Sequence, residues 1–211
     1  MNTEKIIAGE LLSIGAVFLR PEEPFTWASG IKSPIYCDNR LILSAPKSRT
    51  VVENAIAEAV KKYYPETQML MGTSTAGIAH AAIPAEILGL PMGYVRGAAK
   101  DHGRGNRIEG NMPEGTKVVV IEDLISTGGS VIDVVEALRE AGAQVLGIVS
   151  IFTYGMQKGL DRLAAAAVTN HSLSNLDALV EVAVEKGIIT GEWAPRIISF
   201  RNNPSDESWI K

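Results

Sequence analysis

Short apolar runs that alternate with helix-length amphipathic segments constrain the fold of this chain more than any other feature. Four runs are mostly free of alternating polar residues: QMLMG (68–72), MGYVR (92–96), KVVVIE (117–122) and VLGIVSIF (145–152). We interpret AAVTN (166–170) as a candidate fifth run. Helical patterns separate them at 76–89, 128–141 and 156–165. Such strands are typical of sheets buried on both faces. The pattern predicts an α/β fold with a central parallel sheet flanked by helices.

The segments outside this core are less regular. Helical spacing of apolar residues predicts helices at 3–14 and 45–64, while residues 17–44 contain several prolines and glycines. A further helix is expected to end at Gly187, followed by a polar tail. We interpret 1–211 as a single domain, with a small N-terminal lobe (1–45), an α/β core (46–172) and C-terminal helices (173–211).

Composition excludes several classes of protein. The 211 residues carry a net charge of -4, whereas proteins that coat nucleic acid need an excess of cations. Cys37 is the only cysteine, so neither an intrachain disulfide nor a cysteine-rich metal site is possible. Charges at Glu4, Lys5 and Glu10 interrupt any signal peptide, and no apolar run is long enough to span a bilayer. We expect a cytoplasmic protein that binds neither nucleic acid nor membrane.

The third apolar run ends in two acids and then a hydroxyl-rich glycine turn, in the sequence VVVIEDLISTGGS (118–130). Ligands of open parallel sheets lie beyond the carboxyl ends of the strands. Gly128 and Gly129 allow the backbone to turn its amides inward, and a helix that begins near Ser130 presents its positive end. The segment therefore predicts a cradle for one phosphate.

The acids Glu122 and Asp123 would repel a phosphate unless they face another group. Carboxylates accept hydrogen bonds, and the hydroxyls of a ribose donate them, so this pattern indicates a ribose 5-phosphate ligand. A divalent cation nearby would also relieve the negative charge. The frame GTSTAG (72–77) continues with Ile78 and Ala79 and is therefore not a P-loop, and no strand leads into G-x-G-x-x-G.

A long glycine-containing segment precedes this motif. Residues 94–110 have a local charge of +2, from the cations Arg96, Lys100, Arg104 and Arg107 and the acids Asp101 and Glu109. No periodic apolar pattern is present between Gly97 and Gly115. Long loops in compact domains are often functional lids. We interpret this segment as a lid that closes over a polyanion rather than as an inert surface loop.

Three motifs together resemble one family. VVVIEDLISTGGS resembles the phosphoribosyl pyrophosphate (PRPP) signature of type I phosphoribosyltransferases, and its STGGS ending resembles the orotate-specific members. YVRGAAKDHGRGNRIEG (94–110) resembles their mobile catalytic loop, and FTWASGIKSPIYCDNR (25–40) resembles the hood over the base site. The chain differs from some members at Gly97, Ala28 and the turn 73–76, which lack the lysines found there.

The resemblance implies an orotate phosphoribosyltransferase, which transfers the 5-phosphoribosyl group of PRPP to orotate and releases pyrophosphate in pyrimidine biosynthesis. It implies Lys100, His102 and Asp123 as catalytic residues and Ser126 beside orotate. The residues implied to bind PRPP are Arg96, Lys100, His102, Glu122, Asp123, Leu124, Ile125, Ser126, Thr127, Gly128, Gly129 and Ser130.

The resemblance also implies Mg²⁺ bound with PRPP, and a homodimer in which the loop 97–113 acts in trans. No His or Cys set has the spacing of a structural metal site, and we expect none. His80, among alanines, is expected to be packed and hydrogen-bonded rather than catalytic. Two alternatives remain open: transfer to another base, such as a purine, and a regulator that binds PRPP without turnover.

Overall fold

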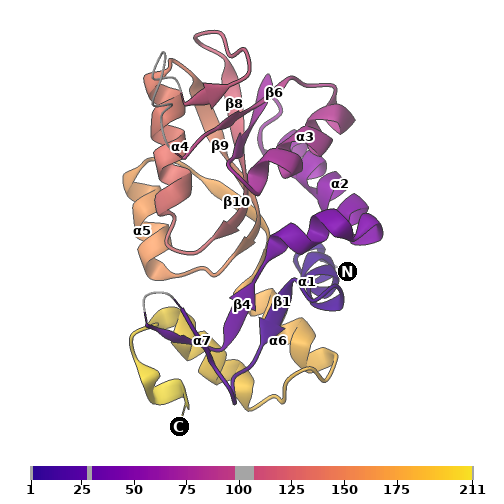
Figure 1. Cartoon of the computed structure of the whole chain (residues 1–211), viewed down its shortest axis with the longest axis vertical. Helices are drawn as coiled ribbons and strands as arrows, with labels where there is room; N and C mark the ends of the chain where they lie inside the picture. The colour runs from indigo at the N-terminus through magenta and orange to yellow at the C-terminus, as the bar shows by residue number, and fades with distance from the viewer. Residues whose placement is uncertain (1, 28–29, 98–106, 211) are drawn as a thin grey trace.

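The strands of the core form one six-stranded sheet in the computed structural model, which describes residues 2–27, 30–97 and 107–210 (Figure 1). The spatial order is β10-β9-β8-β5-β6-β7. All neighbouring pairs are parallel except β6 and β7. The expected α/β fold with a central parallel sheet is confirmed. The strands are β5 (Met69–Thr73), β6 (Met92–Val95), β7 (Ile108–Glu109), β8 (Lys117–Ile125), β9 (Gln144–Thr153) and β10 (Asn170–Asn175).

Helices cover both faces of this sheet. Figure 1 shows α4 and α5 on one face, and α2 and α3 on the other. The central strands are buried by both layers, and the side chains from Val118 to Ile121 are 0% exposed, which explains why β8 has no polar alternation. The helices of the core are α2 (Pro46–Tyr63), α3 (Gly77–Leu88), α4 (Gly129–Glu140) and α5 (Gln157–Ala165).

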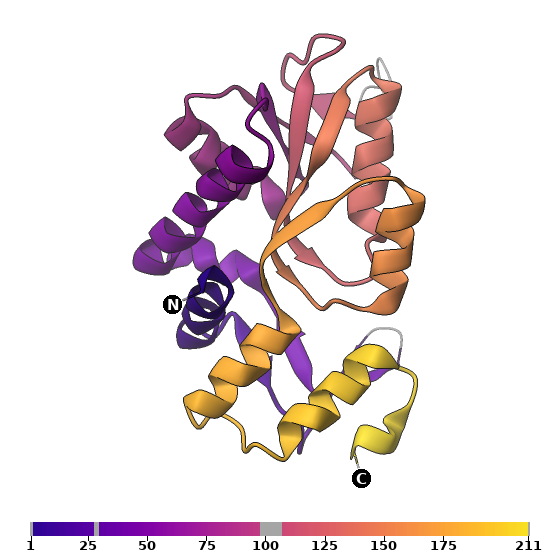
Figure 2. The same cartoon turned by 180° about the vertical axis from the view of Figure 1, so that it is seen from behind.

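Both ends of the chain build a second lobe beside the core. Figure 2 shows α6 and α7 next to the N-terminal strands, beyond the end of the sheet. The N-terminal elements are α1 (Thr3–Ser13), β1 (Val17–Leu19), β2 (Phe25–Thr26), β3 (Lys32–Ser33), β4 (Ile35–Cys37) and the 3-10 helix η1 (Asn39–Ser44). The C-terminal elements are α6 (Leu176–Glu185), α7 (Trp193–Asn202) and the 3-10 helix η2 (Glu207–Ile210).

Aromatic rings join these two ends. The ring of Trp27 lies 5.7 Å from Phe200 and 6.0 Å from Tyr154 between centroids, and Phe200 in turn contacts Trp209 at 5.7 Å. Phe200 and Trp209 are buried at 0% and 3% exposure. The prediction of a polar tail after Gly187 is therefore wrong, because α7 and η2 bury apolar side chains against a partner that is distant in the sequence.

Two strand boundaries also differ from the expectations. The last strand is Asn170–Asn175 rather than 166–170, since α5 continues to Ala165 and Ala167 turns with a positive φ of 47°. This is an edge strand, and its polar residues gave no apolar run. β8 extends to Ile125, beyond the predicted end at Glu122, so both acids lie within the strand.

His80 is packed and hydrogen-bonded, as expected. Its side chain is 0% exposed, and Nδ1 lies 2.6 Å from Oε1 of Glu53, which joins α3 to α2. In the described residues, none of the helices combines the length and the apolar character that crossing a membrane requires.

Candidate active site

The carboxyl end of β8 carries the two acids of the motif in different environments. Glu122 is buried at 5% exposure, whereas Asp123 is half-buried. Oε1 of Glu122 accepts hydrogen bonds from Oγ1 of Thr73 at 2.7 Å and from the backbone N–H of Asp123 at 2.9 Å. Burial, together with hydrogen bonding to the Asp123 carboxyl, raises the pKa of Glu122 to about 8. Asp123 is therefore the more available carboxylate.

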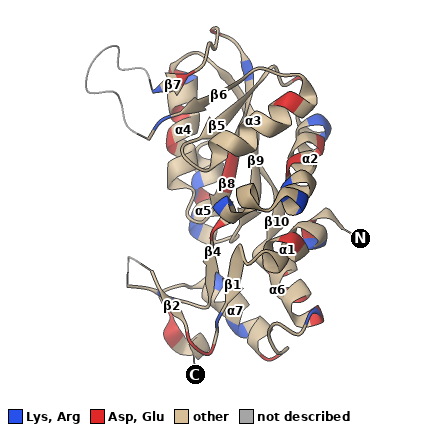
Figure 3. Cartoon of the chain, turned by 45° about the vertical axis from the view of Figure 1, so that its right-hand side comes forward, with Lys and Arg blue, Asp and Glu red and all other residues tan. Residues whose placement is uncertain are grey.

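The turn after β5 lies opposite this end of β8. Thr73, Ser74, Thr75 and Ala76 line one wall of a cavity of about 440 Å³. Its other walls include the predicted residues Glu122, Asp123, Leu124 and Ser130, together with Asp133 of α4. This volume is within the roughly 300–1,000 Å³ of small-molecule sites. Figure 3 shows acidic residues along β8 where it reaches this end of the sheet.

The glycine turn places the start of α4 beside the same cavity. Gly128 is the N-cap residue with φ of +73°, in the left-handed region that favours glycine. Gly129 begins the helix, so the backbone amides of its first turn have no partner within the helix. Gly129 and Ser130 are exposed to solvent. The turn from Ser126 to Ser130 thus has the geometry of an anion-binding helix start.

The basic loop leaves and rejoins the fold at adjacent points. The backbone N–H of Arg96 donates to the carbonyl of Arg107 at 2.8 Å, and Nε of Arg107 donates to the carbonyl of Arg96 at 2.9 Å. The guanidinium of Arg107 also pairs with the Asp133 carboxylate of α4. This ion pair holds the pKa of Asp133 below its usual value. The predicted catalytic residues Lys100 and His102 lie outside the described residues.

The described residues from the predicted set do not all share the 440 Å³ cavity. Arg96 does not line it, and its Nη1 lies 3.8 Å from the Glu109 carboxylate. Ile125 and Ser126 line a larger cavity of about 850 Å³ instead. Thr127, Gly128 and Gly129 connect the two groups along the chain and line neither cavity. In the described part of the chain, no three His, Cys, Asp or Glu side chains form a group suited to a metal ion.

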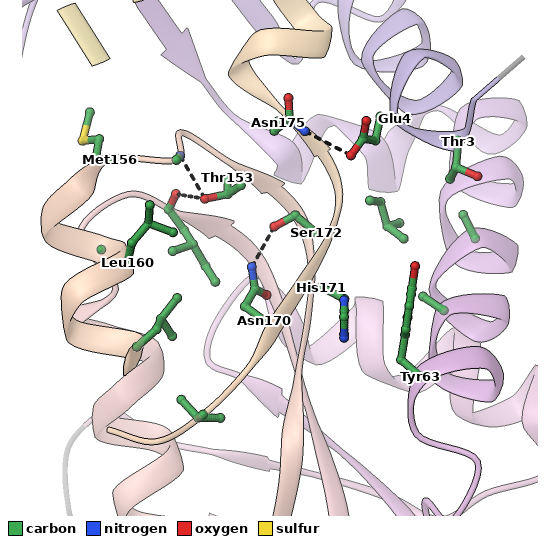
Figure 4. A pocket seen from close by; sticks show the side chains of 18 of the residues that line it. Thr3, Glu4, Tyr63, Thr153, Met156, Leu160, Asn170, His171, Ser172 and Asn175 are labelled. Atoms are coloured by element: carbon green, nitrogen blue, oxygen red, sulfur yellow. Dashed lines mark hydrogen bonds between the residues drawn. The ribbon is translucent and has the colours of Figure 1, made fainter. Parts of the chain in front are cut away.

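The larger cavity runs along the edge strand β10, between α1, α2 and α5 (Figure 4). Figure 4 shows the ring of His171 facing that of Tyr63, and their centroids are 3.7 Å apart. Asn170 donates to Ser172, and Asn175 donates to Glu4. This cavity is not lined by the acid pair or by the turn 73–76. We therefore place the candidate active site at the smaller cavity.

Two residues of this region were not predicted from the sequence. Asn39 is buried at 1% exposure, and its Nδ2 donates to the backbone carbonyl of Asp123 at 2.7 Å. Asp133 lines the cavity one helical turn after Gly129. A single asparagine in an irregular segment gives no periodic signal, and Asp133 looks like an ordinary acid on the solvent face of a helix.

Comparison with known proteins shows the family of this chain. The model of the phosphoribosyl transferase domain family matches residues 40–181. The chain is 58% identical to an orotate phosphoribosyltransferase of Bacillus anthracis over 207 residues, which cover 98% of this chain and 99% of that protein. It is 57% identical to the orotate phosphoribosyltransferase of Bacillus cereus (strain G9842), with the same shares covered.

Solved structures have the same fold. Orotate phosphoribosyltransferase from Aeropyrum pernix matches with a TM-score of 0.75 and 30% identity, over 87% of this chain and 99% of that chain. UMP synthase from Leishmania donovani matches with a TM-score of 0.79 and 25% identity, over 94% of this chain and 42% of that chain. The chain therefore belongs to the phosphoribosyltransferase family, and within it to the orotate phosphoribosyltransferases.

Proposed function

We propose that this chain transfers the 5-phosphoribosyl group of PRPP to orotate, which gives orotidine 5'-monophosphate and pyrophosphate. The observation that carries the proposal is the cavity shared by Asp123, Ser130 and the turn 73–76. It combines a carboxylate for ribose hydroxyls, a helix start for a phosphate and a second turn for a diphosphate. PRPP is a ligand that presents all three groups.

The two acids of β8 take different roles in this proposal. The Asp123 carboxylate accepts hydrogen bonds from the ribose hydroxyls and faces the ring where positive charge develops. Glu122 is held by Thr73 and is mainly uncharged near neutral pH, because its pKa is raised to about 8. It therefore fixes the end of β8 against the turn 73–76 and adds little negative charge next to the diphosphate.

The remaining groups bind the ends of PRPP. Leu124 and Ile125 complete β8, and the turn from Ser126 to Ser130 holds the 5-phosphate through amides and hydroxyls, with Ser126 also next to orotate. The turn 73–76 takes the diphosphate. Lys100 and His102, from the basic loop, donate to the departing pyrophosphate, and Arg96 adds charge at the base of that loop.

The reaction requires stabilisation of charge rather than a nucleophilic side chain. A ring nitrogen of orotate forms a bond to the anomeric carbon while the bond from that carbon to pyrophosphate breaks, with inversion. The ribose becomes cationic and the leaving oxygen becomes anionic. Asp123 stabilises the first charge, and Lys100 with His102 stabilises the second. Closure of the loop would exclude water, which otherwise hydrolyses PRPP.

Mg²⁺ is proposed to enter bound to PRPP. The site fits such an ion because Asp123 lines the cavity and its carboxylate is the ligand type that Mg²⁺ prefers, whereas both carboxylate oxygens of Asp133 bind the Arg107 guanidinium. Asp123 would hold the ion, directly or through water. When bound, the ion supplies Lewis-acid stabilisation of the pyrophosphate.

We also propose that the enzyme works in the cytoplasm as a homodimer, and that the loop 97–113 of one subunit serves the site of the other. The support for this arrangement is the resemblance of residues 94–110 to the mobile loop of the family, while the contacts of Arg96 with Arg107 bring both ends of the loop together. Lys100 and His102 would then act in trans.

Assays of the purified protein with Mg²⁺, PRPP and one base at a time test the function. Orotate consumption is expected. Consumption of adenine or hypoxanthine instead would favour a purine-specific enzyme, and PRPP binding without turnover would favour a regulator. Lys100→Ala should lower kcat by about a hundredfold to a thousandfold without loss of folding. A Lys100→Ala enzyme with near-normal turnover would exclude the proposed role of the loop.

Mixed dimers test the trans arrangement. Lys100→Ala and Asp123→Asn subunits should each be nearly inactive alone. If the loop acts in trans, one site of each mixed dimer combines an intact loop with an intact Asp123, and random mixing should restore about a quarter of the wild-type activity. If the loop acts in cis, every site keeps one defect, and mixing restores nothing.

A further inference from the structure

One face of α5 lies directly behind the turn that we propose as the 5-phosphate cradle. Gly159 and Arg162 are three residues apart on this helix and so share a face. A Cβ atom on Gly159 would lie 2.6 Å from the carbonyl oxygen of Ser126. Only a glycine allows the two backbones to approach so closely, and the contact is with backbone, which cannot move aside easily.

Arg162 reaches the same turn with its guanidinium group. Its Nη1 donates a hydrogen bond to the carbonyl oxygen of Thr127 at 3.1 Å. The same nitrogen is 3.3 Å from the position that a Cβ on Gly129 would occupy. None of the ion pairs between described residues includes Arg162. Its positive charge is therefore not neutralised by a paired carboxylate within the described part of the chain.

The hydrogen bond from Arg162 to the Thr127 carbonyl fixes the orientation of the peptide between Thr127 and Gly128. In a trans peptide the carbonyl and the following N–H point in opposite directions. When Arg162 holds the carbonyl of Thr127 on the α5 side, the N–H of Gly128 must point away from α5, toward the inside of the turn. Because the neighbouring glycines make rotation of this peptide easy, nothing else in the local sequence fixes its direction.

We infer that Arg162 is a positioning residue for the 5-phosphate of PRPP, which acts through the Thr127 carbonyl. It keeps a backbone amide directed at the phosphate and prevents a carbonyl oxygen from turning into the anion site. Its charge also makes the turn more positive. This inference rests on the proposed cradle at 126–130 and adds a residue that the motif does not contain.

The matched control is Arg139 on α4. Its Nη1 and Nη2 donate to the carbonyl oxygens of Ala166 and Ala167 at 2.7 and 3.1 Å, at the connection between α5 and β10. Both arginines are exposed and both bind backbone carbonyls, but only Arg162 touches the cradle. Effects shared by Arg162→Met and Arg139→Met therefore reflect stability alone.

Steady-state kinetics and calorimetry of the purified full chain test the inference. Arg162→Met should raise the KM for PRPP and the Kd for ribose 5-phosphate about tenfold, as expected for one charge-assisted hydrogen bond. The kcat, the KM for orotate and the Kd for pyrophosphate should stay within about twofold. Arg162→Lys should lie between wild type and Arg162→Met, and Arg139→Met should match wild type.

Unchanged ribose 5-phosphate affinity in Arg162→Met would overturn the inference. So would an equal loss of all ligand affinities in the Met variants of Arg162 and Arg139. Ser130→Ala tests the proposed cradle separately from the role of Arg162. If Ser130→Ala weakens ribose 5-phosphate while Arg162→Met does not, the cradle stands and the inference is wrong. If neither variant weakens it, both are wrong.

Discussion

The side-chain amide of Asn39 donates to the backbone carbonyl of Asp123 across 2.7 Å, although the two residues are 84 positions apart. Sγ of Cys37 lies 3.3 Å from the Asn39 amide oxygen, so both ends of the amide are engaged. The contact joins the N-terminal lobe to the end of β8, where Asp123 is proposed to bind the ribose hydroxyls. The lobe and the core are thus connected at the site itself.

We predict that Asn39→Ala lowers the free energy of unfolding by about 1–3 kcal/mol, because it removes the Asn39 donor from the half-buried backbone of Asp123. The KM for PRPP should rise, since the backbone next to the proposed ribose ligand is released. Chemical denaturation and kinetics measure the two effects. Asn54→Ala is the control, because Asn54 donates to the Thr50 carbonyl at the same 2.7 Å but on an exposed helix face. A similarly small change in both variants would contradict the prediction.

Asp123→Asn should reduce kcat by about a hundredfold to a thousandfold, because the amide cannot stabilise a cationic ribose. The fold should be retained, since the Asp123 backbone keeps its contact with Asn39. Asp161→Asn, at an exposed acid on α5, should leave kcat unchanged. Turnover of the Asp123→Asn enzyme close to that of wild type would remove this residue from the mechanism.

Glu122→Gln should change how stability depends on pH. The pKa of Glu122 is raised in the folded state to about 8 from 4.5, so the folded protein retains a proton that the unfolded chain loses. The free energy of unfolding of the wild type should therefore fall as pH rises from 4.5 to about 8, whereas the neutral Gln variant should not show this loss. We expect the variant to gain about 1–2 kcal/mol on wild type between about pH 6 and about pH 8.

The control for this pH effect is Glu66→Gln. Lys117 lowers the pKa of the exposed Glu66 through a hydrogen bond, so its contribution is lost only as pH falls below the ordinary carboxyl range. Denaturation of both variants across the same pH values should show a pH-dependent difference from wild type for Glu122→Gln alone. A constant offset for Glu122→Gln would show that Glu122 is ionised in the folded protein.

Gly77→Ala should disturb the turn 73–76. A Cβ on Gly77 would lie 2.5 Å from Oγ1 of Thr73 and 2.6 Å from the carbonyl of Ile121, so either α3 or the strand end must shift. We expect a loss of about 1–3 kcal/mol in unfolding free energy and weaker binding of pyrophosphate. Gly191→Ala, where nothing lies within 4 Å of the added atom, should have neither effect. Calorimetry with pyrophosphate and thermal unfolding measure both.

Much of the core could be predicted because local pattern and burial agree there. The strands β5, β8 and β9 are buried on both faces and therefore appear as apolar runs. The edge strand β10 is polar, and the burial of α7 includes the contact of Phe200 with Trp27, which is distant in the sequence. Neither has a local signal that identifies it.

The site was predictable in its chemistry but not in its division of roles. The motif placed Asp123 and Ser130 beside one cavity with the turn 73–76. The burial of Glu122 and its hydrogen bond to Thr73 join residues 49 positions apart, and no spacing rule in the sequence reports such a contact. The same is true of Asn39, whose partner is a backbone atom.

The edge-to-face contacts of Trp27 with Phe200, and of Phe200 with Trp209, have a consequence for synthesis of the protein on the ribosome. The segment 25–40 is translated early, but the rings that support Trp27 emerge only after α6 has been completed. A nascent chain would thus assemble the half with the proposed phosphate site first, and the lobe that contains Trp27 would be completed only near the end of translation.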